Sequence, residues 1–481
     1  MKTNDMKPHH ASHDQYKVLC IGSLTEFGER YSYYVIQALL IFFLIERFNI
    51  AQSQSATLVG TVLSMVYISA LIGGYVADKL INYYRAAFLG SLFMIAGSGI
   101  LALSSSKNEL YLGLALISVS TGLIKSNISS FIGRFYDKSA LSDGNRDFGF
   151  NVFYVGINLG SFFALFMASS LKESYGFSAP FYSSLIVACL ISLNLIIGFF
   201  VVRRYIADVT IDLMKTVKAM LVLGGYIICV FVVLKNPILA DFSILIAAFV
   251  CIGILLLSAR KKYWRNVIKA LVFFLLSVLY WALYFQLFIS LLLFISLAVD
   301  HKVLFFRLSS SQFLGVESLG VLIFGFFMGR LWMRLESKGK AVADIDKFRL
   351  AFVLIAVMFL LYWAGSYFSA GEAKVSAWVI ISGLIVLSIS ELSLSAIGLS
   401  LVTKIAPPNF VSLYMGIWLV TLGIGGKLAG FMSSFIALPN DIAVAKQNMA
   451  VGLLSFMFIA IGGIVICVLV RRLMQADKSG D

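Results

Sequence analysis

Long apolar runs recur along the whole chain, and they constrain the fold more than any other feature of the sequence. A run of about 20 apolar residues can cross the hydrocarbon core of a bilayer, roughly 30 Å thick, as a helix. The sequence is 60% hydrophobic and only 13% charged, whereas soluble domains are about one half apolar and one quarter charged. We therefore predict an all-α membrane protein with many membrane-spanning helices.

The apolar runs form a group of six, a central pair and a second group of six. The predicted spans are 18–45, 56–78, 86–105, 110–133, 149–171 and 180–202, then 218–235 and 240–259, and finally 266–298, 312–332, 350–370, 377–404, 411–437 and 449–470. This pattern predicts 14 transmembrane helices. The expected domains are a tail (1–17), an N-terminal six-helix bundle (18–202), a linker with two extra helices (203–265), a C-terminal six-helix bundle (266–470) and a second tail (471–481).

Lys and Arg gather in the loops on one side of the predicted spans, for example in "GRFYDKSALSDGNR" and "ARKKYWR". Because cytoplasmic loops carry an excess of Lys and Arg, both termini are expected to be cytoplasmic. The first residues are polar and show no apolar core of a cleavable signal peptide. We predict a multi-pass protein of the inner (plasma) membrane. The net charge of +14 is explained by these loops, and no nucleic-acid partner is expected.

Two six-helix groups joined by a basic linker favour the two-lobed transporter architecture of the major facilitator superfamily. The segment "GGYVADKLINYYR" (73–85) supports this prediction, because Asp78 lies at a cytoplasmic helix end and Arg85 closes a short loop. Asp78 and Arg85 are candidate gating residues. The alternative is an ordinary ion pair in a loop.

Charged side chains inside the predicted spans are the strongest functional signal, because a charge within a bilayer normally faces a cavity or a partner. On a helix, Glu26 and Arg30 are neighbours at i,i+4, and Glu29 lies on nearly the same face. Two carboxylates with one guanidinium leave an excess negative charge, which a proton or the ammonium of Lys125 could balance. A substrate group that draws Arg30 or Lys125 away would favour protonation of a glutamate, so binding and protonation would be coupled. The alternative is a static ion cluster that holds two helices together.

Glu391 is an acid deep in the second group of spans, with serines and glycines around it. With Arg30 and Lys125 as a positive pole and Glu391 as a negative pole, a central cavity would suit a small zwitterion. The alternative is an acid satisfied by neighbouring serines. Two further charges within spans, Glu317 and Lys427, have no role that the sequence indicates.

Cysteine and histidine placement indicates neither a metal nor a cofactor site. The five cysteines lie in apolar runs without CxxC or Cys/His spacing. Three of the four histidines lie in the polar N-terminal segment, and no nucleophile–base spacing is present. We expect no cofactor, no bound metal and no enzymatic activity.

Four segments together resemble the proton-dependent oligopeptide transporters. "EFGERYSYY" (26–34) resembles the ExxERxxYY signature of their first helix, and "FYVGINLGSF" (153–162) resembles their helix 5 signature. "GLIKSNIS" (122–129) and "SELSLSAIGLSLVTKIAP" (390–407) are similar to their helix 4 and helix 10 segments. The resemblance covers nearly the whole chain, and the extra central helix pair is typical of bacterial members. It implies symport of di- and tripeptides with protons by alternating access.

The resemblance also implies roles for particular residues. Proton coupling would involve Glu26, Glu29, Arg30 and Lys125. The peptide carboxylate would face Arg30 and Lys125, and the amino group would face Glu391. The substrate pocket would further include Tyr34, Tyr67, Tyr154, Asn158 and Trp418.

The sequence departs from the family pattern at two places that bear on gating and coupling. Gln37 stands where many members carry a second arginine, so the outer-gate acid Asp300 would lack its usual partner. Phe285 stands where many members carry a helix 7 glutamate, which places more of the proton coupling on the first helix.

The leading hypothesis is therefore a monomeric, proton-coupled importer of short peptides. A second hypothesis is a divergent carrier for another small zwitterion or an anion such as nitrate, or an exporter. A third, from a different class, is a peptide receptor on the same scaffold that does not transport.

Overall fold

The structure is a computed structural model that describes residues 8–139, 141–203, 212–258, 264–340, 342–407 and 411–479. Its first part contains α1 (Pro8–Phe42), η1 (Phe43–Arg47), α2 (Gln52–Val76), η2 (Ala77–Ile81), α3 (Tyr83–Leu103), α4 (Lys107–Lys138), α5 (Asp143–Tyr175), α6 (Ser178–Val202) and α7 (Leu213–Lys235). It continues with α8 (Pro237–Ser258), α9 (Trp264–Tyr284), η5 (Phe285–Phe288), α10 (Ser290–Ala298), β1 (Lys302–Val303), β2 (Phe306–Arg307), α11 (Ser310–Ser337), α12 (Asp344–Phe368), α13 (Ala377–Ile405), α14 (Val411–Ser433) and α15 (Ile442–Ser479).

The helices of the described residues match the predicted number of membrane spans. By length and hydropathy, 13 of them could cross a membrane, with α9, η5 and α10 together making one span. The remaining helix is α1, which carries Glu26, Glu29 and Arg30 in the middle of its apolar sequence. Counted with α1, the described part of the chain contains the 14 expected spans.

The helix ends and one helix interior differ from the predicted spans. The first helix already begins at Pro8, and the last continues to Ser479. The run predicted as one helix over 266–298 is interrupted by the 3₁₀ turn η5, where Ile289 has φ −123° and ψ −93°. Hydropathy indicates the length of an apolar run but not where a helix begins or ends. The longer first and last helices and the break at η5 therefore could not be predicted from hydropathy.

The buried amide of Gln286 stabilises the break between α9 and α10. Its Oε1 accepts hydrogen bonds from Ser290 Oγ at 2.7 Å and from Ser433 Oγ at 2.6 Å. Its Nε2 donates to the carbonyls of Ala282 and Ala429, at 3.3 and 3.2 Å. A buried amide with all its partners is favourable inside a membrane protein, because an unsatisfied polar group is costly there.

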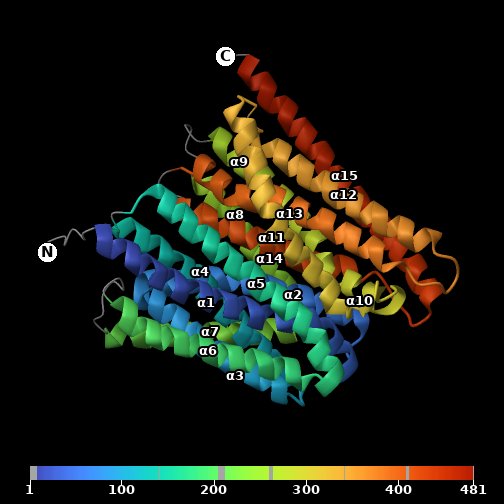
Figure 1. Ribbon diagram of the computed structural model, residues 1–481, viewed down its shortest axis with the longest axis horizontal. Coiled ribbons are helices and arrows are strands. Elements are labelled where there is room, and N and C mark those ends of the chain that lie inside the picture. The colour runs from blue at the N-terminus through green and yellow to red at the C-terminus, as the bar shows by residue number, and fades with distance from the viewer. Residues whose placement is uncertain are drawn as a thin grey trace. The chain divides into compact units, whose positions relative to one another are not determined.

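The chain divides into two compact units. Unit 1 comprises Met1–Leu39 and Met65–Asn236, and unit 2 comprises Leu40–Ser64 and Pro237–Asp481. This division cuts α1 and α2, so it differs from the predicted bundles 18–202 and 266–470, which remain a prediction. In unit 1, α3 packs along α4 and α6. In unit 2, α12 lies beside α15 (Figure 1) and also packs on α13.

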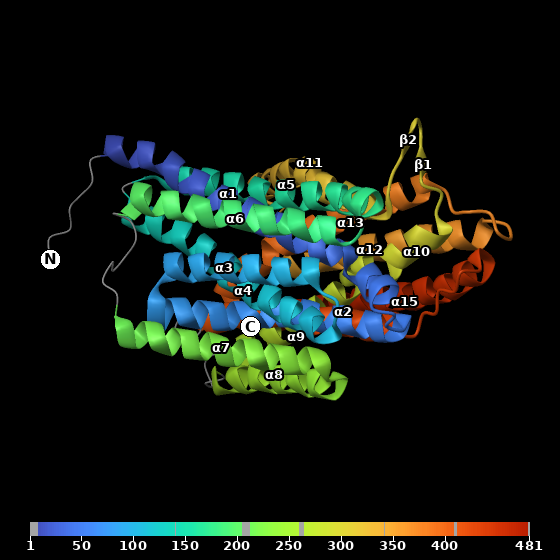
Figure 2. The same cartoon turned by 90° about the horizontal axis from the view of Figure 1, so that it is seen from below.

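Unit 2 also contains a short β-hairpin between α10 and α11. Strands β1 and β2 pair antiparallel, with Lys302 opposite Arg307. Figure 2 shows the hairpin projecting away from the neighbouring helix α10. Its tip is apolar and open, since Phe305 is 96% exposed, and Leu304 adopts the left-handed conformation with φ 52°.

Candidate functional site

Glycines hold α1 tightly between two neighbours in unit 1. A Cβ on Gly156 of α5 would lie 3.1 Å from the carbonyl oxygen of Ser23. A Cβ on Gly28 of α1 would lie 2.7 Å from Cγ1 of Ile191 on α6. Small residues allow such close helix contacts in membrane proteins. The position and rotation of α1 are therefore fixed by backbone packing, and with them the directions of its charged side chains.

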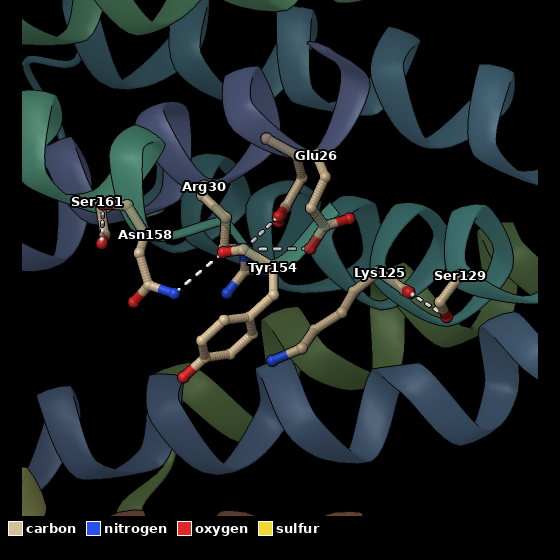
Figure 3. A network of polar contacts seen from close by, with 8 residues as sticks. Glu26, Arg30, Lys125, Ser129, Tyr154, Asn158 and Ser161 are labelled. Atoms are coloured by element: carbon tan, nitrogen blue, oxygen red, sulfur yellow. Dashed lines mark hydrogen bonds and ion pairs between the residues drawn. The ribbon is translucent and has the colours of Figure 1, made fainter. Parts of the chain in front are cut away.

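The three charges of α1 form one buried ion cluster. Arg30 Nε lies 2.5 Å from Glu29 Oε2 and 3.6 Å from Glu26 Oε1. All three residues are at most 3% exposed. Figure 3 shows the carboxylate of Glu26 directed at the guanidinium of Arg30. The predicted i,i+4 pairing of Glu26 with Arg30 is thus present, and Glu29 makes the shorter contact.

The cluster retains unused hydrogen-bonding capacity. Within the described part of the chain, Glu26 Oε2, Glu29 Oε1 and Arg30 Nη2 are buried without a hydrogen-bond partner. Two carboxylate oxygens can accept a proton, and one guanidinium nitrogen can donate to an anion. This combination is suited to binding a proton and a carboxylate at adjacent positions.

A second cation and several aromatic rings lie next to the cluster. Lys125 Nζ lies 5.1 Å from the centre of the Tyr67 ring, and Arg30 Cζ lies 5.1 and 5.9 Å from the rings of Tyr33 and Tyr34. These are cation–π distances. Lys125 is also close enough to Glu26 to stabilise its negative charge. Lys125, predicted as a second positive group, is therefore part of the same site.

The helix 5 segment contributes Tyr154 and Asn158 to this side of unit 1. Asn158 Nδ2 donates to the backbone carbonyl of Tyr154 at 2.9 Å, and Ser161 Oγ donates to the carbonyl of Asn158 at 2.9 Å. In Figure 3 the side chains of Tyr154 and Lys125 extend into the same space. The structure thus brings together all the predicted site residues of unit 1 except the gating candidates.

In unit 2, the predicted residues Glu391 and Trp418 lie in different surroundings. Trp418 is 4% exposed and packs at ring distances of 6.2 Å from Phe274 and 6.4 Å from Phe348. Glu391 is half-buried on α13 and lies within hydrogen-bonding reach of Glu317 on α11. The sequence showed Glu317 as a charge within a span, but the pairing of the two acids required the fold.

The gating candidates are placed at three separate points of the fold. Gln37 of α1 is 4% exposed, and both polar atoms of its amide lack a hydrogen-bond partner among the described residues. Asp300 is exposed and accepts a hydrogen bond from the backbone N–H of Lys302 at the hairpin. The backbone N–H of Arg85 donates to the Asn82 side chain at 3.0 Å.

Asp78 takes part in a contact that the sequence did not predict. It accepts a hydrogen bond from the hydroxyl of Tyr83, and Arg134 Nη2 donates to the same hydroxyl at 2.6 Å. The Arg134 guanidinium also lies 4.2 Å from the centre of the Tyr83 ring. In the sequence, Arg134 directly follows the predicted span 110–133 and does not differ from the other basic residues of the loops. The sequence alone therefore could not predict its contact with Tyr83.

A protein-family model described as "POT family" matches residues 84–450 of the chain. The chain belongs to this family. The resemblance inferred from the motifs is therefore confirmed.

Similar proteins and structures agree with this assignment. The chain is 28% identical to dipeptide and tripeptide permease A of Serratia proteamaculans, over 92% of this chain and 88% of the relative. It is also 28% identical to dipeptide and tripeptide permease B of Salmonella typhimurium, over 89% of this chain and 88% of the relative.

Solved structures of similar fold cover almost the whole chain. A bacterial homologue of the human drug peptide transporters PepT1 and PepT2 superposes with a TM-score of 0.83 at 22% identity, over 96% of this chain and 99% of that one. A peptide transporter POT in complex with sulfate superposes with a TM-score of 0.82 at 23% identity, over 96% and 94%. The predicted all-α transporter fold is thereby confirmed, and the chain is a multi-pass membrane protein.

Proposed function

We propose that this protein is a proton-coupled symporter that imports di- and tripeptides by alternating access. Membership of the POT family supports this proposal, as do relatives that are named dipeptide and tripeptide permeases. The observation that carries it is the buried cluster of Glu26, Glu29 and Arg30 beside Lys125, with polar atoms left unused on all three α1 residues. Charged side chains within a membrane helix are energetically unfavourable, and they commonly mark a functional site.

Coupling follows from the charges of the cluster. The peptide carboxylate binds Arg30 Nη2 and the ammonium of Lys125, which are the cationic groups of the site. The positive charges of Arg30 and Lys125 are then shared between the peptide and the glutamates. The negative charges of Glu26 and Glu29 are therefore less completely neutralised. One glutamate takes up a proton in response, because like charges close together in a buried site cannot both remain ionised. Peptide and proton therefore bind with positive cooperativity.

The rest of the substrate is bound by uncharged and acidic side chains. We assign the peptide amino group to Glu391, and the side chains and backbone of the peptide to the remaining pocket residues: Tyr34, Tyr67, Tyr154, Asn158 and Trp418. Gln37, Asp78, Arg85 and Asp300 are assigned to gating.

We further propose that the protein works as a monomer in the inner membrane with both termini in the cytoplasm. The orientation rests on the basic loops, since Lys and Arg favour the cytoplasmic side. Tetrameric crystals of PepTSo2, which superposes with a TM-score of 0.83 at 21% identity, offer the alternative assembly. Labelling of single cysteines in inverted and right-side-out vesicles tests the orientation, and light scattering in detergent tests the assembly.

Uptake by reconstituted liposomes tests the function. With an inward proton gradient, dialanine should accumulate above its external concentration, whereas single amino acids and nitrate should not. Accumulation also separates a transporter from a receptor. No gradient-driven uptake of any di- or tripeptide contradicts the proposal, and uptake of nitrate or an amino acid instead favours a divergent carrier.

A glutamine substitution at Glu29 tests the coupling. Glu29→Gln removes a proton acceptor but keeps the shape of the side chain, so gradient-driven uptake should be lost while exchange of peptide across the membrane continues. Glu173→Gln, an exposed acid on α5, is the matched control and should behave as wild type. Normal accumulation by Glu29→Gln would show that the proton acceptor is elsewhere.

A further inference from the structure

Unit 2 contains a pair of acids whose joint chemistry the proposed function does not use. Glu317 on α11 is 4% exposed, and its carboxyl lies within hydrogen-bonding reach of Glu391 on α13. The two helices approach closely, because a Cβ on Gly320 of α11 would overlap the side chain of Ser388 on α13. The acids are therefore held together by packing between helices and not by a mobile loop.

Hydroxyl groups surround the pair, and none of the ion pairs of the described residues includes either acid. Ser318 Oγ donates to Glu317 Oε2 at 3.4 Å, and the hydroxyl of Tyr284 on α9 also hydrogen-bonds Glu317. Tyr280 on α9 is close to both acids, and its hydroxyl contacts Ser390 Oγ at 3.0 Å. Among the described residues no Lys or Arg forms an ion pair with either acid. The pair thus differs from the α1 cluster, in which Arg30 compensates the glutamates.

One oxygen of the pair has no donor. Glu317 Oε1 is buried without a hydrogen-bond partner in the described part of the chain. An ionised carboxylate only accepts hydrogen bonds, so two ionised acids at this distance repel each other and cannot bond. A single proton held between the two carboxyls removes the repulsion and gives the pair a donor.

We propose that Glu317 and Glu391 share one proton, and that the ammonium group of the substrate displaces this proton into solution. The second step rests on the proposed function, whereas the first does not. With one proton the pair carries a single negative charge. An arriving ammonium supplies the positive charge that the proton supplied before, so the proton is released.

Displacement gives the two ends of the substrate opposite effects on protons. At the α1 cluster, the peptide carboxylate favours uptake of a proton. At the acid pair, the peptide ammonium favours release of one. The net number of protons bound with each peptide is then the number taken up at the α1 cluster minus the number released at the acid pair. Glu317 influences this number although it does not contact the peptide carboxylate.

Infrared difference spectroscopy tests proton sharing in the ligand-free protein. The purified protein in liposomes should show the carbonyl stretch of a protonated carboxylic acid that disappears as the pH is raised. Both Glu317→Gln and Glu391→Gln should lose this band, because either change removes one half of the pair. Glu336→Gln, an exposed acid on the same helix α11, is the control and should retain it. An unchanged intensity of this band in Glu317→Gln, or a band that sodium abolishes at constant pH, overturns the proposal.

Calorimetry of dialanine binding tests the displacement. The dependence of the binding heat on the ionisation enthalpy of the buffer counts the protons exchanged. Glu317→Gln should bind dialanine with up to about one more proton taken up per peptide than wild type, and Glu336→Gln should match wild type. An unchanged count contradicts displacement. If no dipeptide binds to any variant, the proposed function fails, while the infrared band still decides whether the proton is shared.

Discussion

Lys427 of α14 forms an ion pair with Asp241 of α8, with 2.9 Å between Nζ and Oδ1. The same ammonium donates to Thr61 Oγ1 of α2 at 3.0 Å. Lys427 is 7% exposed, whereas the Asp241 side chain is 65% exposed. A buried ammonium in a membrane helix requires such partners. The extra helix α8 is therefore joined to α14 by an ion pair and contributes to the packing of unit 2.

Replacing Asp241 should weaken the structure. Asp241→Asn keeps a hydrogen-bond acceptor but removes the negative charge beside the Lys427 ammonium, and the loss of a charged partner at a buried donor costs about 1–3 kcal/mol of unfolding free energy. Thermal unfolding in detergent should show a lower midpoint. The double variant Asp241→Asn/Lys427→Met removes the uncompensated charge and should recover much of the loss. If Asp241→Asn unfolds at the wild-type midpoint, the ion pair contributes nothing.

The contact between α2 and α14 should be sensitive to a single methyl group. A Cβ on Gly60 would lie 2.7 Å from the carbonyl oxygen of Gly426 and 2.8 Å from Cα of Gly430. Backbone atoms cannot move aside, so Gly60→Ala should separate the helices and cost about 1–3 kcal/mol. Thermal unfolding and the uptake rate should both fall.

Gly74→Ala is the control for this change, because it lies on the same helix and its Cβ would meet nothing within 4 Å. It should be neutral or slightly stabilising, since alanine favours a helix more than glycine does. Equal effects of the two substitutions would contradict a role for close packing at Gly60.

The sequence predicted those features that depend on local spacing. Apolar length predicts the spans, and the i,i+4 spacing of Glu26 and Arg30 predicts the ion pair that the structure contains. The bonding of Lys427 to Asp241 and of Glu317 to Glu391 depends on which helices become neighbours. Hydropathy carries no information on that choice, because nearly every span has apolar residues on all sides.

The break between α9 and α10 could not be predicted for a related reason. Residues 285–289 contain no proline or glycine, which are the usual local causes of a helix break. The break depends on Gln286, whose partners include Ser433 and Ala429 of the distant helix α14. Only the tertiary structure reveals that this amide is satisfied there.

The Tyr67 ring should contribute to substrate binding through Lys125. Nζ lies 5.1 Å from the ring centre, and such a contact contributes about 0.5–2 kcal/mol. Tyr67→Leu removes the ring and should raise the KM for dialanine roughly two- to thirtyfold. Tyr67→Phe keeps the ring and should stay closer to wild type. Uptake kinetics in liposomes measure both, and equal KM values for the two variants would exclude the ring as the cause.

Removing the Tyr83 hydroxyl should slow transport without weakening peptide binding. This hydroxyl connects Asp78, at the start of η2, to Arg134 near the end of α4. It lies at the predicted cytoplasmic ends of the helices and outside the α1 cluster, so it acts on the conformational step. Tyr83→Phe retains the ring under the Arg134 guanidinium, and the lost hydrogen bonds contribute about 0.5–1.5 kcal/mol. The maximal uptake rate should fall roughly two- to tenfold, while the dissociation constant for dialanine stays unchanged.

Tyr111→Phe, which removes a hydroxyl elsewhere on α4, is the control and should transport at the wild-type rate. Proton-driven uptake gives the maximal rate, and calorimetry gives the dissociation constant. A raised dissociation constant in Tyr83→Phe would place the hydroxyl in substrate binding. An unchanged rate would mean that the Asp78–Tyr83–Arg134 contact is structural, and that the gating assigned to Asp78 is wrong.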